Sequence, residues 1–166
     1  MTSDVHATYA RVLWNYGDRD GAVAIFRERE ELNEMDKVTY SIWIDLLWED
    51  GRIKEARNLF SKSGLSFPNW QENGANCLDL HGCSGGGSAA ICLETYIREL
   101  AKKTNGLPIF IVAICGKGLH SKDKEIGSIL RKFLLENFDK IRGVEKIEED
   151  PHNLGKLNVF PTFRNP

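Results

Sequence analysis

The chain of 166 residues lacks the features that mark membrane and secreted proteins. Its longest apolar run covers residues 107–115, far short of the ~20 residues that a membrane-spanning helix needs. The first residues contain no basic segment followed by an apolar core, so we expect no secretory signal. We therefore expect an intracellular protein, cytoplasmic by default, with no membrane partner.

Neither sign of charge dominates, because 22 Lys and Arg residues stand against 24 Asp and Glu residues. This balance excludes a generally polybasic surface, so binding of nucleic acid would need a local basic patch. The cysteines form no CxxC pair, and we expect them to be reduced thiols. A zinc site is not expected, because no common zinc finger has the spacing of the candidate ligands Cys77, His81, Cys83 and His120.

A helical repeat organises the first part of the chain. Residues 17–26 align with residues 51–60, and the same offset of 34 residues separates Ala22 from Ala56. Each unit reads as an apolar helix, a Gly turn and a second helix, a pattern typical of stacked helix–turn–helix repeats. We therefore predict a small all-α segment over residues 1–66. Its tryptophans have helical spacing and are expected in the core of the repeats: Trp14, Trp43 and Trp48.

The second unit, residues 38–60, resembles a pentatricopeptide repeat. That resemblance implies that Ser41, and Asp36 at the end of the preceding unit, occupy places that contact an RNA base. A tetratricopeptide-type scaffold shares the Ala and Phe positions, and such a scaffold would instead dock a protein partner. Both interpretations stay open at this point.

The pattern changes after the repeats. Residues 67–75 contain Gly, Pro and Asn without an apolar period, which predicts a linker. Beyond it, strands and helices alternate in the order βαβαββ, with Ser88 expected to cap the first helix. We therefore predict an α/β chain whose residues 76–166 form a two-layer sandwich with a mixed sheet.

Two polar loops follow the first two strands of this predicted sheet. The first carries His81 and the second carries His120. Because the carboxyl ends of parallel strands meet at one edge, where open α/β sheets bind ligands, we expect these loops to converge.

The loops carry a specific resemblance. Residues 78–82 (LDLHG), 116–121 (GKGLHS) and 153–155 (NLG) are similar, in order and spacing, to motifs of the Smr (small MutS-related) domain. Smr domains cleave or bind nucleic acid, and their combination with pentatricopeptide repeats is associated with RNA. The resemblance implies an endonuclease, with RNA favoured over DNA as the substrate.

Cleavage of a phosphodiester needs a base, an acid and stabilisation of charge at the phosphate. Histidine is the usual side chain for acid–base catalysis, so His81 and His120 are candidates for base and acid, and Asp79 could orient His81, act as a base or hold a divalent cation such as Mg²⁺. The glycine-flanked turn that begins the second loop could bring backbone N–H groups to a phosphate. The candidate phosphate-binding residues are Gly116, Lys117, Gly118, Ser121 and Lys122, and the candidates for further contact with nucleic acid are Lys124, Arg131 and Ser41.

Two functions from different classes follow. The first is an endonuclease that acts by hydrolysis or transesterification, with the repeats binding substrate or partner. The alternative is a non-catalytic module that grips nucleic acid while its repeats dock a protein.

Overall fold

The computed structural model describes residues 3–103, 108, 110–116 and 126–162. The chain is α/β and divides into two compact units, one of residues 1–65 and one of residues 66–166. The division lies one residue from the predicted end of the helical segment. Within the described residues, no helix is both long and apolar enough to cross a membrane.

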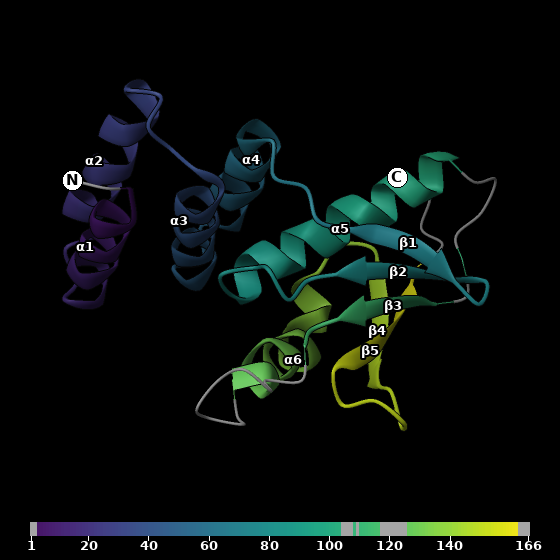
Figure 1. Ribbon diagram of the computed structural model, residues 1–166. Coiled ribbons are helices and arrows are strands. Elements are labelled where there is room, and N and C mark those ends of the chain that lie inside the picture. The colour runs from purple at the N-terminus through teal and green to yellow at the C-terminus, as the bar shows by residue number, and fades with distance from the viewer. Residues whose placement is uncertain (1–2, 104–107, 109, 117–125, 163–166) are drawn as a thin grey trace. The chain divides into compact units, whose positions relative to one another are not determined.

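Unit 1 consists of two helical hairpins (Figure 1). Helices α3 and α4 begin 34 residues after α1 and α2, so the predicted repeat is confirmed. The helices are α1 (Ser3–Asn15), α2 (Arg19–Glu31), α3 (Lys37–Glu49) and α4 (Ile53–Ser63).

The turns inside the two hairpins are the same. Gly17 and Gly51 have φ of +90° and +76°, a left-handed conformation that side chains disfavour. The N–H group of Gly17 donates to the carbonyl of Trp14, and that of Gly51 to the carbonyl of Trp48, both at 3.0 Å. The glycine that ends the first helix therefore fixes the same chain reversal in each repeat.

Aromatic residues form the core of unit 1. Trp14, Trp43 and Trp48 are 2%, 6% and 5% exposed, which confirms their predicted place in the core. The rings of Phe26 and Trp43 stack with centroids 5.2 Å apart, and so join helix α2 to helix α3.

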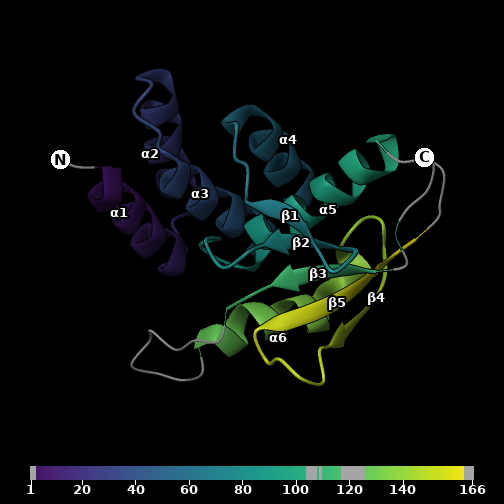
Figure 2. The same ribbon diagram turned by 45° about the vertical axis from the view of Figure 1, so that its right-hand side comes forward.

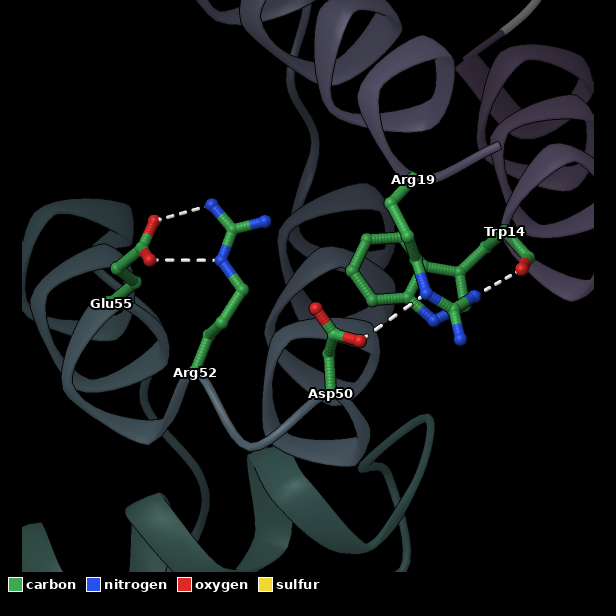
Figure 3. A network of polar contacts seen from close by, with 5 residues as sticks. All are labelled: Trp14, Arg19, Asp50, Arg52 and Glu55. Atoms are coloured by element: carbon green, nitrogen blue, oxygen red, sulfur yellow. Dashed lines mark hydrogen bonds and ion pairs between the residues drawn. The ribbon is translucent and has the colours of Figure 1, made fainter. Parts of the chain in front are cut away.

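A polar network also joins the two hairpins (Figure 3). The guanidinium of Arg19 lies 4.6 Å from the ring centroid of Trp14 and donates to the Trp14 carbonyl. Its Nε lies 3.2 Å from the carboxylate of Asp50 in the second hairpin. Arg52, two residues after Asp50 in the chain, pairs instead with Glu55 at 2.7–2.8 Å.

Unit 2 contains a five-stranded mixed sheet of order β1-β2-β3-β5-β4. Strands β2 and β3 are parallel, and the other neighbours are antiparallel. In Figure 2, α5 and α6 lie behind the sheet. The elements are β1 (Asn69–Glu72), β2 (Ala75–Asp79), α5 (Gly86–Lys103), β3 (Ile111–Ile114), α6 (Ile126–Asn137), the 3₁₀ helix η1 (Phe138–Lys140), β4 (Val144–Glu149) and β5 (Lys156–Pro161).

The predicted linker 67–75 is wrong in one respect, because it contains strand β1. Asn73 and Gly74 have φ of +50° and +79°, as a tight turn between paired antiparallel strands requires. All four residues of β1 are exposed, so this edge strand has no apolar alternation that sequence analysis could detect. The observed order is therefore ββαβαββ.

The predicted cap of the first helix of unit 2 is also wrong. Helix α5 begins at Gly86, and the Ser88 hydroxyl inside its first turn donates to the carbonyl of Gly85 at 3.1 Å. A Cβ atom on Gly86 would lie 2.2 Å from the ring of Phe133 in α6. The absent side chain therefore lets α5 and α6 pack closely.

Candidate functional site

The candidate site lies at the edge of the sheet where β2 and β3 end and β5 begins. Asp79 is paired with Ile114 in the parallel register of β2 and β3, which confirms the predicted parallel pairing. Ile114 is in turn paired with Lys156 of β5. Residues directly opposite each other in a sheet share a face, so Asp79, Ile114 and Lys156 form one row across it.

Asp79 holds His81 through two contacts to the same oxygen. Oδ1 of Asp79 accepts the backbone N–H of His81 at 3.0 Å. The same oxygen contacts ring atom Nδ1 of His81. The Asp79 side chain is 15% exposed and that of His81 is 64% exposed. A sheltered carboxylate therefore fixes the orientation of an accessible imidazole.

The loops after β2 and β3 meet beside this pair. A Cβ atom on Gly116 would lie 3.4 Å from Cβ of His81. The N–H of Leu80 also donates to the carbonyl of Ile114 at 2.8 Å, which continues the pairing beyond β2. Gly116 has φ of +80°, so the chain turns sharply there.

A third loop, residues 153–155, joins the same edge. The side-chain oxygen of Asn153 accepts the N–H of Gly155 at 3.0 Å, which closes a local turn. The carbonyl of Gly155 accepts the N–H of Cys115 at 2.8 Å. The described parts of the three motifs that sequence analysis singled out are therefore brought together.

Arg131, a predicted nucleic-acid contact, reaches this third loop from helix α6. One of its terminal nitrogens donates to the carbonyl of Leu154 at 3.3 Å. Its Nε lies 3.7 Å from the carboxylate of Glu149. The guanidinium is therefore already engaged within unit 2.

Cys115 is a buried group beneath the loops. Burial raises the pKa of its thiol to about 12, while Arg131 acts to lower that pKa and Asp79 acts to raise it. Since the thiolate is the reactive form, this cysteine is poorly suited to act as a nucleophile or a metal ligand.

Several predicted site residues lie outside the described residues. They are Lys117, Gly118, His120, Ser121, Lys122 and Lys124. The predicted convergence of His120 with His81 therefore remains a prediction, although Gly116 brings the start of its loop against His81.

The base-contacting role of Ser41 is not supported by its place in α3. Ser41 is 4% exposed, so its hydroxyl is not presented to a base. Asp36 caps the same helix, because its carboxylate accepts the N–H of Thr39 at 2.7 Å. Both residues therefore have positions explained by packing and helix capping.

Sequence analysis did not single out Lys156. It stands in the same row as Asp79, and its Nζ lies 3.9 Å from the carboxylate of Glu72. The only signal was its position directly after the NLG loop. Among the described residues, no group of three or more His, Cys, Asp and Glu side chains is arranged to hold a metal ion.

The fold and this edge define an α/β unit with an Asp–His pair beside glycine-containing loops, preceded by two helical repeats. No family model, curated protein or solved structure matches the chain.

Proposed function

We propose that unit 2 is a nucleic-acid endonuclease, acting on RNA in preference to DNA. The observation that carries the proposal is the contact of Asp79 with Nδ1 of His81 at the edge where the loops after β2 and β3 meet. The similarity of residues 78–82, 116–121 and 153–155 to Smr motifs supports the same function and the preference for RNA.

His81 has the arrangement of a general base. A carboxylate only accepts hydrogen bonds, so Nδ1 of His81 carries the proton in its contact with Asp79. In the neutral ring, Nε2 then has a free lone pair that can accept a proton from the attacking hydroxyl. At 64% exposure, the His81 side chain is accessible to a substrate as large as a nucleic acid.

The second loop would supply the acid and the groups that bind the phosphate. His120 would donate a proton to the leaving oxygen, and the backbone N–H groups of residues 116–118 would stabilise charge on the phosphate. Lys117, Ser121 and Lys122 would add contacts to phosphate oxygens. General acid–base catalysis of this kind contributes ~10²–10⁴-fold to a rate.

A divalent cation fits this edge only if the substrate and water supply most of its ligands. Mg²⁺ commonly binds one or two carboxylates together with substrate phosphates and water. Asp79 would be the carboxylate that this edge supplies. When bound, the ion would polarise a phosphoryl oxygen of the substrate.

The alternative function is binding of nucleic acid without cleavage. The burial of Ser41, which is only 4% exposed, favours the part of this alternative in which the repeats dock a protein instead of contacting RNA bases. Binding through phosphates would weaken steeply as salt rises, and no shortened product would form.

The proposal is tested by single-turnover cleavage of labelled RNA and DNA oligonucleotides with Mg²⁺ and with EDTA. His81→Ala should reduce the rate by ~10²–10⁴-fold. His152→Ala is the matched control, because the N–H of His152 donates to Asp150 at 2.8 Å in the same Asp-x-His arrangement. Binding without product from any substrate would favour the alternative.

A further inference from the structure

The sheet of unit 2 has a hollow on the face that points away from its helices. Leu78, Ala113 and Leu157 are paired in register and are 1%, 0% and 0% exposed, so their row faces α5 and α6, which lie behind the sheet in Figure 2. Neighbouring residues along a strand point to opposite faces of the sheet. The hollow, about 430 Å³ in volume, is lined by the neighbours of that row and so lies on the other face: Cys77, Val112, Lys156 and Asn158.

The size of the hollow and its aromatic wall suit a flat organic group. Pockets that hold small ligands have volumes of ~300–1,000 Å³. Phe110 lines the hollow and is 37% exposed, and its ring centroid lies 6.1 Å from that of Phe160. An accessible phenyl ring held in this way can stack on a nucleic-acid base.

Two opposite charges meet at the hollow. Lys156 is on β5 and Glu72 is on β1, with β2 and β3 between them in the sheet, yet Nζ of Lys156 lies 3.9 Å from a carboxylate oxygen of Glu72. Burial and, to a lesser degree, the charge of Glu72 raise the pKa of the Cys77 thiol, and Lys156 acts to lower it, so both charges lie close to Cys77. A separation of 3.9 Å is too long for a hydrogen bond. A donor and an acceptor therefore stand side by side without bonding to each other.

We propose that this hollow binds a guanine base of the RNA substrate. Guanine carries an acceptor, O6, next to two donors, N1–H and the N2 amino group. Lys156 would donate to O6, Glu72 would accept from N1–H and N2–H, and the ring would stack on Phe110. The inference rests on the proposed function for the identity of the substrate, and it adds the part of that substrate which is recognised.

The charges of the hollow favour a base over a phosphate, and guanine over the other bases. Asp150 adds a second carboxylate to the lining, and carboxylates repel a phosphate. Uracil offers a single N–H donor on its pairing edge. Adenine and cytosine offer an amino group beside a ring nitrogen that is an acceptor, which a carboxylate would repel. Guanine alone presents two adjacent donors to Glu72.

The hollow adjoins the candidate catalytic edge. Lys156 shares a row with Asp79, and one strand lies between them. Because neighbouring strands are about 4.8 Å apart, the backbones of these two residues are separated by roughly 10 Å. A base held by Lys156 would bring a neighbouring phosphate toward His81, so we expect cleavage close to a guanosine.

The test measures binding separately from cleavage. The full chain with His81→Ala is titrated against fluorescent hexamers of uridine in which one position is guanosine, inosine or adenosine. By fluorescence anisotropy, the Kd for the guanosine hexamer should be roughly 5–150-fold lower than that for the adenosine hexamer. Inosine lacks the N2 amino group and should give an intermediate Kd.

Glu72→Gln, added to the same chain, should remove most of the preference for guanosine. Glu148→Gln is the matched control, because Glu148 is paired with Asn158 on the same face of the sheet and its carboxylate contacts Lys146. This control should keep the full preference.

The outcomes separate this inference from the proposed nuclease. Equal affinity for the guanosine and adenosine hexamers would overturn the inference, even if the parent chain cleaves RNA. A preference that persists in Glu72→Gln would also overturn it, because recognition would then lie outside the hollow. A preference that depends on Glu72 in a chain whose parent cleaves nothing would support the inference and contradict the nuclease. Failure to bind any hexamer would overturn both.

Discussion

His81 and Gly116 lie against each other at the carboxyl edge of the sheet, and a Cβ atom on Gly116 would come within 3.4 Å of Cβ of His81. The glycine therefore has two physical roles. It allows a left-handed turn after β3, and it brings the start of the second loop next to Cβ of His81, whose ring Asp79 orients.

Gly116→Ala should reduce both stability and nuclease activity. The φ of +80° makes a side chain cost about 1–2 kcal/mol, and the added methyl group would come into van der Waals contact with Cβ of His81. Gly74→Ala is the matched control, because Gly74 has φ of +79° with nothing within 4 Å of its Cβ. Urea unfolding should show similar losses for both variants, while only Gly116→Ala slows cleavage. Equal activity in the two variants would show that the contact between residue 116 and His81 does not affect cleavage.

Cysteine reactivity should follow burial. Burial raises the pKa of Cys92 and Cys115 to about 12, so at pH 8 nearly all of each thiol stays protonated and unreactive. Half-buried Cys83 should react with iodoacetamide first, and the three buried thiols of Cys77, Cys92 and Cys115 only after unfolding. Mass spectrometry of the labelled folded chain measures this order. Rapid labelling of Cys115 in the folded chain would show that the loops above it open readily.

Gly86→Ala should destabilise unit 2 through helix packing. The new methyl group would lie 2.2 Å from the Phe133 ring, and overpacking of this kind costs about 1–3 kcal/mol. Phe133→Ala should remove most of that penalty in the double variant, a coupling that a double-mutant cycle detects. Gly82→Ala serves as the control, since its nearest neighbour would be Phe67 at 3.9 Å. Additive losses for Gly86 and Phe133 would contradict the close approach of α5 and α6.

Phe26→Ala should loosen the junction between the two repeats. Phe26 is fully buried and stacked on Trp43, so its truncation should cost about 3–5 kcal/mol. Tyr16→Ala removes another ring from unit 1, but Tyr16 is 87% exposed and its loss should change stability by less than about 0.5 kcal/mol. Tryptophan fluorescence during urea unfolding measures the stability of both variants. Similar small effects would mean that the stack does not hold the repeats together.

The repeats and the parallel edge could be predicted because their signals are local. The offset of 34 residues and the glycines of the turns can be read directly from the sequence. Parallel pairing of β2 and β3 could be predicted because a helix connects the two strands. Strand β1 escaped prediction because its side chains are all exposed, although Asn73-Gly74 is a strong hairpin signal.

Contacts between distant segments could not be predicted in the same way. Burial of Ser41 depends on how the helices of unit 1 pack, which no local pattern specifies. The close approach of Gly86 to Phe133 depends on how α5 and α6 pack, and the place of Lys156 in the row of Asp79 depends on the register of β3 and β5. The contact between Asp79 and His81 was suggested by strand alternation, but β2 ends at Asp79, and the contact is made within a turn in which the N–H of His81 donates to the Asp79 carboxylate.

The double-mutant cycle of Asp79→Asn and His81→Ala, measured as single-turnover cleavage of RNA, tests the central claim most directly. If Asp79 acts by orienting His81, each single variant should lose ~10²–10⁴-fold, and the double variant should be no slower than His81→Ala. Circular dichroism should show that all three variants remain folded. Losses that multiply in the double variant, or variants that cleave as fast as the parent chain, would contradict the claim.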